Sequence, residues 1–372
     1  MLKAGVIATI AVLGAASWGH DGYGPGNTRY NPAETGVNAS TVDRLQPRWT
    51  VRPAAARPGC EPAPAGPRAV GDRVYLLDGG GVAAYAAGTG RRLWHHAGTG
   101  LITAGPIVAG GLVLVASTAC ESASSYDSAL IALDAATGAQ RWRRTAAWTA
   151  DTAIADAGVI VTSGECGTCD DARHAVTAHQ LDDGTPLWTH HNEVLAGPVS
   201  AAGTVLLRRT TGKAETWAGR ITTGTPVWGT GTRVTAVAAN PDGTHLYLTG
   251  DGGLSARSAT DGSRLWRIPK EAGDLAADGR RVYVASAGRV NTYDAGTGRL
   301  AWTRALTTPR DPVRAGGLLY VLTGKGALTV LTPAGGKVVR LRNTYTGLRT
   351  HVVPAGGRLL TTRGAEVRAY AP

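Results

Sequence analysis

The residues of this 372-residue sequence best suited to redox or metal chemistry are its four cysteines and the acidic residues near them. The cysteines are Cys60, Cys120, Cys166 and Cys169, and the acidic neighbours are Glu61, Glu121, Glu165, Asp170 and Asp171. Cysteine thiolates can bind zinc, exchange electrons as a dithiol pair, or close structural disulfides. These are the three interpretations that the spacing of the cysteines has to separate.

The interpretation that we favour is a pair of structural disulfides, Cys60–Cys120 and Cys166–Cys169, among the three connectivities that four cysteines allow. A four-cysteine zinc site is an alternative, although only one C-x₂-C unit is present where two would be typical. A redox-active Cys166-Gly167-Thr168-Cys169 is a second alternative, but no helix N-terminus follows to lower a thiol pKa. We therefore assign no metal site.

Other chemistry-bearing patterns are weak. The pairs His95-His96 and His190-His191 follow repeated tryptophans, and we interpret them as exposed strand-edge residues. The glycine-rich stretches 22–26 and 79–81 open no helix, so neither is a dinucleotide-binding loop. Phosphate-binding loops, nucleophile elbows and H-E-x-x-H zinc motifs are missing from the sequence. We assign no catalytic residue.

A glycine followed four residues later by a tryptophan recurs along the chain. The pairs are Gly90/Trp94, Gly138/Trp142, Gly184/Trp188, Gly224/Trp228, Gly262/Trp266 and Gly298/Trp302. Trp49 precedes the series without its glycine, and Gly336 continues it with Arg340 in place of tryptophan. The spacing ranges from 48 residues (Trp94 to Trp142) to 36 residues (Trp266 to Trp302). Periods near 40 residues indicate a propeller or a solenoid.

Each repeat contains four short β-branched or alternating runs bounded by turn residues, and helical periodicity is missing. Four antiparallel strands per repeat make a propeller blade. The chain ends with three such runs, in residues 351–353, 359–361 and 366–370, and the strand around residues 45–51 supplies the fourth. The sequence therefore predicts an all-β, eight-bladed propeller over residues 45–372 whose last blade is closed by the N-terminal strand.

The N-terminus and the charge indicate where such a propeller would work. Residues 1–17 resemble a secretory signal, with Lys3 followed by an apolar run too short to span a bilayer. Residues 18–44 form an extended segment before the propeller. We expect a secreted or extracytoplasmic monomer, attached to a membrane only if the N-terminal segment is kept as an anchor. The net charge of +11 is spread over the repeats, so we expect no nucleic-acid partner.

The blade pattern also places the cysteines. Loops from a fourth strand to the next first strand emerge on the same face of a propeller as loops between second and third strands. Cys60 lies in the first kind of loop, whereas Cys120 and the pair Cys166/Cys169 lie in the second. All four thiols and the five acidic residues should therefore gather on one face, which is our candidate binding face.

The segment Ala132-Leu133-Asp134-Ala135-Ala136-Thr137-Gly138, followed by Trp142, resembles the tryptophan-docking repeat of PQQ-dependent quinoprotein dehydrogenases and their propeller relatives. The stretch from Trp18 to Gly22, with residues 26–32 and then Val42, Leu45 and Trp49, is similar to the segment that opens mature dehydrogenases of that family. The resemblance implies that the repeated tryptophans are structural residues wedged between blades. They are Trp49, Trp94, Trp142, Trp188, Trp228, Trp266 and Trp302.

The resemblance also implies what a dehydrogenase would need. The family holds PQQ between a tryptophan and a disulfide of two adjacent cysteines, with Ca²⁺ on oxygen ligands and an aspartate as base. This chain has no adjacent cysteines and no matching Ca²⁺ or base motif. We expect no cofactor and a non-catalytic binding or scaffold propeller that holds an unknown protein or cell-envelope ligand, as in the BamB-type branch. The alternative is a PQQ- and Ca²⁺-dependent dehydrogenase oxidising alcohols or sugars.

Overall fold

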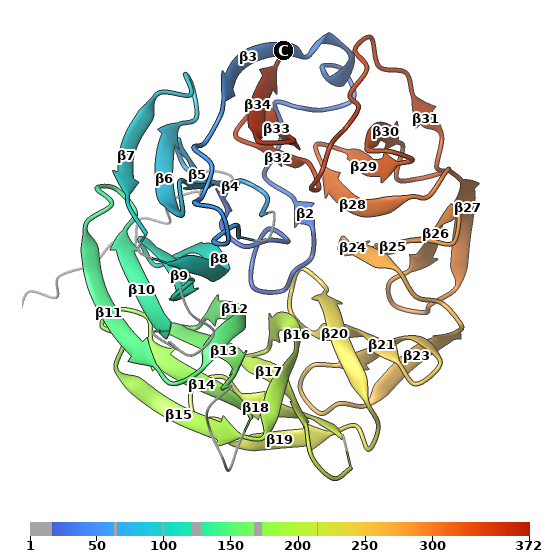
Figure 1. The fold of residues 1–372 in the computed structure, drawn as a ribbon. Coiled ribbons are helices and arrows are strands. Elements are labelled where there is room, and N and C mark those ends of the chain that lie inside the picture. The colour runs from blue at the N-terminus through green and yellow to red at the C-terminus, as the bar shows by residue number, and fades with distance from the viewer. Residues whose placement is uncertain (1–16, 63–64, 99, 121–127, 167–172, 214) are drawn as a thin grey trace, which may run out of the picture.

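The computed structural model describes residues 17–62, 65–98, 100–120, 128–166, 173–213 and 215–372. Eight antiparallel sheets stand around a common axis as the blades of a propeller (Figure 1). Each blade has four strands, which run in sequence order from the axis outward in blades 1 to 7, and the only helix described is the 3₁₀ turn η1 (Val42–Arg44). The predicted all-β, eight-bladed propeller is confirmed.

Blades 1 to 4 follow one another along the chain. Their strands are β4 (Arg68–Val70), β5 (Arg73–Asp78), β6 (Gly81–Ala86) and β7 (Arg92–His96) in blade 1; β8 (Leu101–Ala109), β9 (Leu112–Thr118), β10 (Ser128–Asp134) and β11 (Gln140–Ala146) in blade 2; β12 (Thr149–Asp156), β13 (Val159–Glu165), β14 (His174–Gln180) and β15 (Pro186–His191) in blade 3; and β16 (Glu193–Ala201), β17 (Thr204–Arg209), β18 (Thr216–Arg220) and β19 (Pro226–Gly229) in blade 4.

Blades 5 to 8 complete the ring. Their strands are β20 (Val234–Ala239), β21 (His245–Gly250), β22 (Gly253–Ser258) and β23 (Arg264–Pro269) in blade 5; β24 (Asp274–Ala277), β25 (Arg281–Ser286), β26 (Arg289–Asp294) and β27 (Leu300–Ala305) in blade 6; β28 (Arg310–Ala315), β29 (Leu318–Thr323), β30 (Ala327–Leu331) and β31 (Val338–Val339) in blade 7; and β32 (Val353–Ala355), β33 (Arg358–Arg363), β34 (Glu366–Ala371) and β3 (Gln46–Val51) in blade 8. The strand β3 pairs with β34, so the N-terminal strand closes the last blade as predicted.

A β-bulge precedes the tryptophan in each of the seven tryptophan-bearing outer strands. In blade 3, Trp188 lies opposite Ala178, but Pro186 lies opposite His179, so Leu187 is the extra residue. The same shift occurs in the other six. A bulge bends the strand and redirects the following side chain. Here it turns the tryptophan toward the next blade and leaves residues such as Leu187 exposed.

Each tryptophan docks on the following blade. Its indole N–H donates to a carbonyl oxygen of the next blade's turn between third and fourth strands, at 2.8–3.1 Å; the acceptors, in order from Trp49 to Trp302, are Ala87, Ala135, Leu181, Ile221, Ala259, Ala295 and Pro333. Its ring lies against the glycine of that turn, which is why the repeat contains both residues. A Cβ at Gly138, for example, would lie 2.6 Å from the Trp94 ring.

The two faces of the ring are fixed by the strand register. Leu101, at the start of β8, pairs with Thr118, at the end of β9, so loops before first strands and loops after second strands share one face. We call this the disulfide face, because it carries Cys60 and Cys120. The opposite turn face carries the turns between first and second strands. No described helix is long and apolar enough to cross a membrane.

Candidate functional site

A disulfide joins Cys60 to Cys120, the pairing that the sequence analysis favoured. Cys60 lies in the loop between β3 and β4, and Cys120 follows β9. The bond therefore ties the loop that leads into blade 1 to blade 2, across 60 residues of chain. Because the bond occupies both thiols, the four-cysteine zinc alternative is not compatible with it.

The remaining predicted binding-face residues are only partly described. Cys166 is buried beyond the end of β13, while Glu61 and Glu165 are exposed on the disulfide face. Cys169, Glu121, Asp170 and Asp171 lie outside the described residues, so their gathering with the others stays a prediction, as does the Cys166–Cys169 bond. The carboxylate of Glu61 accepts a hydrogen bond from the Gly59 amide at 2.9 Å. Neither Glu61 nor Glu165 lines the two central pockets described below.

Residues 17–34, which we call the clasp, cross the centre of the ring and contact the innermost strand of every blade in turn (Figure 1). β1 (Ser17–Trp18) adds to blade 1 by pairing with β4, and β2 (Tyr30–Asn31) adds to blade 7 by pairing in parallel with β28. Hydrogen bonds reach the blades between and beyond them; the acceptor or donor positions are Val108 in blade 2, Ala155 in blade 3, Ser200 in blade 4, Val237 and Ala239 in blade 5, Ala277 in blade 6 and Pro354 in blade 8. The clasp thus fastens all eight blades from the inside.

The path of the clasp depends on backbone hydrogen bonds and on a glycine at one close approach. Its carbonyl oxygens bond the otherwise unpaired amides at the ends of the first strands, for example Gly19 O with Val108 N at 2.8 Å. A Cβ at Gly19 would lie 2.3 Å from Val108 O, so only glycine permits this approach. Tyr23, Asn27 and Arg29 have φ angles of 87°, 47° and 48°, a region that non-glycine residues seldom enter. Such outliers are concentrated where function or tight packing requires them.

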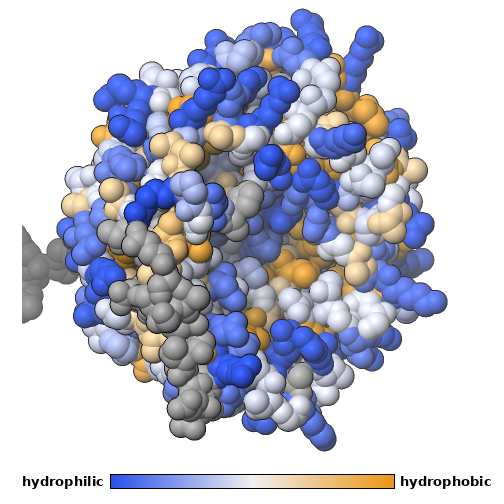
Figure 2. Space-filling model, viewed as in Figure 1, coloured by the Kyte–Doolittle hydropathy of each residue, from blue (hydrophilic) through white to orange (hydrophobic). Residues whose placement is uncertain are grey.

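On the disulfide-face side of the clasp lies an axial cavity of about 440 Å³. Its walls are the first strands of blades 1 to 4, and its clasp residues include His20, Asp21, Asn27 and Arg29. Figure 2 shows the ring face-on, hollowed near its centre and with hydrophilic side chains distributed over the surface around the hollow. This volume, together with a few polar groups in the lining, is typical of a small-molecule site.

Two pairs of opposite charges meet at the axial cavity, whereas Asp151, which also lines it, has no ion-pair partner among the described residues. Asp21 forms a salt bridge of 3.2 Å with buried Arg68, and Arg29 forms one of 2.9 Å with Asp311. Just over half of the Asp21 side-chain surface (55%) stays open within the cavity. Burial would raise the pKa of Asp21, but nearby positive charge, including that of Arg68 and Arg29, outweighs this effect and holds the pKa below its ordinary value.

Two histidines border this cluster. Burial lowers the pKa of His20 to about 4, and its Nε2 hydrogen-bonds the Ala155 carbonyl at 2.8 Å. Burial also lowers the pKa of His351, whose ring stacks on Trp18 at 6.0 Å between centroids. Both imidazoles are therefore neutral at neutral pH. The Nε2 atom of His351 has no hydrogen-bond partner among the described residues.

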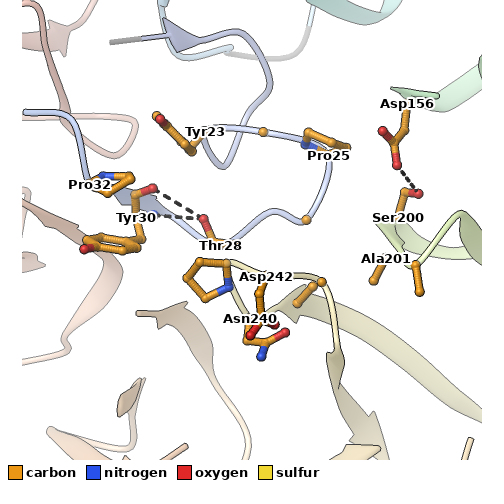
Figure 3. A pocket seen from close by; sticks show the side chains of 16 residues that line it. Tyr23, Pro25, Thr28, Tyr30, Pro32, Asp156, Ser200, Ala201, Asn240 and Asp242 are labelled. Carbon is orange, nitrogen blue, oxygen red and sulfur yellow. Dashed lines mark hydrogen bonds between the residues drawn. The ribbon is translucent and has the colours of Figure 1, made fainter. Parts of the chain in front are cut away.

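A second pocket, of about 300 Å³, opens on the turn face of the clasp. We call it the turn-face pocket. Figure 3 shows Tyr23, Tyr30 and Pro32 on one side of it and Asp156, Ser200 and Ala201 on the other. Gly24 of the clasp lines both pockets, so the clasp separates the turn-face pocket from the axial cavity.

Comparison with known proteins places this architecture in a family. A family model described as outer membrane protein assembly factor BamB matches residues 34–169 and 172–371. The chain belongs to this PQQ-repeat propeller family. No curated protein sequence matches it.

Solved structures share the fold of this family member at low sequence identity. BamB from Moraxella catarrhalis aligns with a TM-score of 0.63 and 19% identity, over 88% of this chain and 100% of that one. The quinohemoprotein alcohol dehydrogenase of Comamonas testosteroni aligns with a TM-score of 0.67 and 13% identity, over 95% and 80%. ADHIIG, a quinohemoprotein alcohol dehydrogenase of Pseudomonas putida HK5, aligns with a TM-score of 0.68 and 13% identity, over 96% and 80%. The fold is shared by both kinds of protein.

The described lining of the axial cavity does not fit PQQ. No tryptophan or cysteine is among its lining residues, and Trp18, the nearest in the clasp, is fully buried against His351 and Tyr23. The disulfide joins cysteines 60 residues apart rather than an adjacent pair. Within the described ranges, no group of three His, Cys, Asp or Glu residues could hold a metal ion. The described lining therefore offers a flat quinone neither a tryptophan ring nor a disulfide of adjacent cysteines to stack on.

Sequence reasoning missed the central pockets. The pocket-lining side chains Asp21, Tyr23, Arg29 and Tyr30 belong to the segment that carried the family resemblance, but the sequence analysis gave them no role. The signal available was composition: residues 18–32 place tryptophan, tyrosine, histidine, aspartate and arginine among closely spaced glycines before the first repeat. That density of polar and aromatic residues in a non-repeating segment is typical of a binding loop.

Proposed function

We propose that this protein is a non-catalytic, extracytoplasmic binding propeller. The observation that carries the proposal is the state of the axial cavity, where the propeller fold would place a reactive centre. Four charged side chains in or beside it are paired, Asp21 with Arg68 and Arg29 with Asp311, and the nearby His20 and His351 are neutral. Among the charged residues described in its lining, only Asp151 has no ion-pair partner. Groups that are mutually paired hold a structure in place and have little capacity left to move protons.

Two further features support a binding role outside the cytoplasm. The Cys60–Cys120 disulfide is a bond that persists in oxidising compartments. The family model that matches the chain is named for an assembly factor of the outer membrane. A rigid ring with long loops on the disulfide face suits the presentation of a binding surface.

The competing proposal is a PQQ-dependent dehydrogenase, which the quinohemoprotein neighbours favour by fold alone. It would require a quinone to stack without a tryptophan platform and Ca²⁺ to bind without an oxygen cage among the described residues. We therefore rank it second.

Calorimetric titration of the oxidised protein with PQQ in excess Ca²⁺ tests the proposal. We expect no saturable heat, and no dye-linked oxidation of ethanol or glucose after incubation with both. The matched control is Arg68→Gln, which removes the Asp21 salt bridge together with the bonds of Arg68 to the Gly66 and Pro106 carbonyls. Stoichiometric PQQ binding by the wild type, weakened in Arg68→Gln, would overturn the binding role and establish the dehydrogenase.

A further inference from the structure

The turn-face pocket is built by four separate parts of the chain. The clasp contributes Tyr23, Pro25, Thr28 and Tyr30; blade 3 contributes Asp156 at the end of β12. The ends of β16 and β20 and the turns that follow these strands supply the rest, which includes Ser200, Asn240, Pro241 and Asp242. The pocket therefore exists only because the clasp lies across the ring.

The lining combines flat apolar rings with hydrogen-bonding groups. Two tyrosines and three prolines present ring faces, the prolines being Pro25, Pro32 and Pro241. No hydrogen bond to the Tyr23 or Tyr30 hydroxyl occurs among the described residues, so neither hydroxyl is committed to a partner within that part of the chain. The backbone of Tyr23, at φ 87°, is held in its strained conformation by Gly19 and His20, whose amides both donate to its carbonyl oxygen.

The polar end of the pocket is fixed in position and only partly used. Asp156 accepts a hydrogen bond from the Ser200 hydroxyl at 2.7 Å, shown as a dashed line in Figure 3, and one from the Ala157 amide. Asp242 accepts bonds from the amide and hydroxyl of Thr244 through its Oδ1 atom alone. Each carboxylate therefore keeps acceptor capacity facing the pocket.

The charges restrict what the pocket can hold. Two carboxylates line it and no lysine, arginine or histidine does, so an anion would meet repulsion without a cation to pair with. The carboxylates can attract a cation or accept hydrogen bonds from the hydroxyl groups of a neutral ligand, and Arg314 already lies over the Tyr30 ring at 5.8 Å. Of these two ligands, the neutral one uses the whole lining, with apolar faces for the rings and hydroxyls for the carboxylates and phenols.

We propose that the turn-face pocket binds a neutral saccharide. The C–H faces of a pyranose ring pack on tyrosine and proline rings, while its hydroxyls donate to carboxylates and accept from phenols. The elongated lining in Figure 3, with Tyr23, Tyr30 and Pro32 at one side and Asp156 and Ser200 at the other, suits a short oligosaccharide. The inference deepens the binding role proposed above by naming a ligand class, but it rests on a different pocket from the axial cavity.

Ligand-observed NMR and calorimetry with three neutral trisaccharides, maltotriose, cellotriose and chitotriose, test this. We expect at least one to bind saturably and to protect residues 23–32 and 240–243 from hydrogen–deuterium exchange. Neither lysine amide nor citrate should displace the bound trisaccharide.

Tyr30→Ala and Pro241→Ala should each weaken binding by about tenfold, the contribution of one ring contact. Pro241 lies in an exposed turn, so its replacement tests the pocket even if Tyr30→Ala loosens the clasp.

The matched controls are Tyr370→Ala and Pro226→Ala, since neither residue lines the pocket. The proposal is overturned if none of the three trisaccharides binds saturably, if lysine amide displaces the bound one, or if the controls weaken binding as much as the pocket variants. The result is separable from the PQQ titration, because that titration probes the axial cavity on the other side of the clasp.

Discussion

Trp302 packs against Gly336 and donates its indole N–H to the Pro333 carbonyl at 2.9 Å, completing the last tryptophan dock of the ring. Four residues after Gly336 stands Arg340 instead of another tryptophan. A tryptophan there would face blade 8, whose third and fourth strands are β34 and β3, at the two ends of the propeller. No turn connects those strands, so no glycine turn is present to receive it. The degenerate repeat follows from where the ring is closed.

Other contacts join blade 7 to blade 8 at that boundary. The ring of Tyr345 meets the ring of Tyr370 edge-on at 5.0 Å, and the Asn343 side chain donates to the Leu45 carbonyl. Tyr345 is buried in the same cluster as Leu45 and Trp49. The closing blade therefore uses aromatic packing in place of the indole dock.

The tryptophan docks should make the turn glycines intolerant of any side chain. Gly184 and Gly158 have φ angles of 71° and 75°, so alanine is strained equally at both. A Cβ at Gly184 would lie 2.7 Å from the Trp142 ring, whereas a Cβ at Gly158 would meet nothing within 4 Å. We expect Gly184→Ala to lower the free energy of unfolding by about 1–3 kcal/mol more than Gly158→Ala, measured by urea denaturation. Equal losses would show that the dock contributes no specific packing.

The clasp should depend on glycine at one position and not at another. A Cβ at Gly19 would clash with Val108 O at 2.3 Å, whereas Gly24 has open space and no positive φ. We expect Gly19→Ala to speed amide exchange at Val108, Ser200, Ala239 and Ala277, whose amides bond the clasp from blades 2, 4, 5 and 6. Gly24→Ala should leave those amides as protected as in the wild type. Loss of protection at Val108 alone would mean that the clasp is not a cooperative unit.

The sequence predicted the ring because the ring is periodic. Gly138 and Trp142 recur with their spacing in blade after blade, and each repeat has one physical cause, the dock on the next turn. The closure by β3 was predicted for a related reason, since an unpaired fourth strand at one end matched a missing one at the other. Periodicity thus indicated the fold and the blade count, and the family resemblance implied the structural role of the tryptophans.

The central pockets could not be predicted in the same way. The clasp occurs once, and its path is set by separate contacts to eight blades, such as those of Asn27 with Val237 and Asn31 with Pro354. None of these has a sequence period. The salt bridge between Arg29 and Asp311 joins residues 282 positions apart, a pairing that spacing cannot indicate. The acidic residues chosen as the binding face were selected by proximity to cysteines, and Glu61 and Glu165 lie away from both central pockets.

The Cys60–Cys120 disulfide should stabilise the protein by restricting the unfolded chain. It closes a loop of 60 residues, for which the chain-entropy model gives a contribution of about 4 kcal/mol. We expect the double variant Cys60→Ser/Cys120→Ser to unfold at a lower temperature than the oxidised wild type, measured by calorimetry. Reduction of the wild type should bring it close to the variant. A variant as stable as the oxidised protein would show that the unfolded chain keeps these loops together without the bond.

The stability of the clasp should fall as the pH is lowered, because His20 is held neutral. Its pKa is about 4 in the folded protein and 6.5 in an unfolded chain, so the unfolded state takes up a proton that the folded state refuses. The contribution of His20 is therefore complete above pH 6.5, declines as the pH falls from 6.5 to 4, and amounts to at most about 3 kcal/mol. In His20→Gln an amide can donate to the Ala155 carbonyl and does not titrate. We expect the melting temperature of the wild type to drop more steeply than that of His20→Gln over this range.

Burial also lowers the pKa of His351, but that residue is common to both proteins, so the difference between the curves reports His20 alone. Parallel curves would mean that His20 takes up a proton in the folded protein, and that its contact with Ala155 in blade 3 does not exclude solvent.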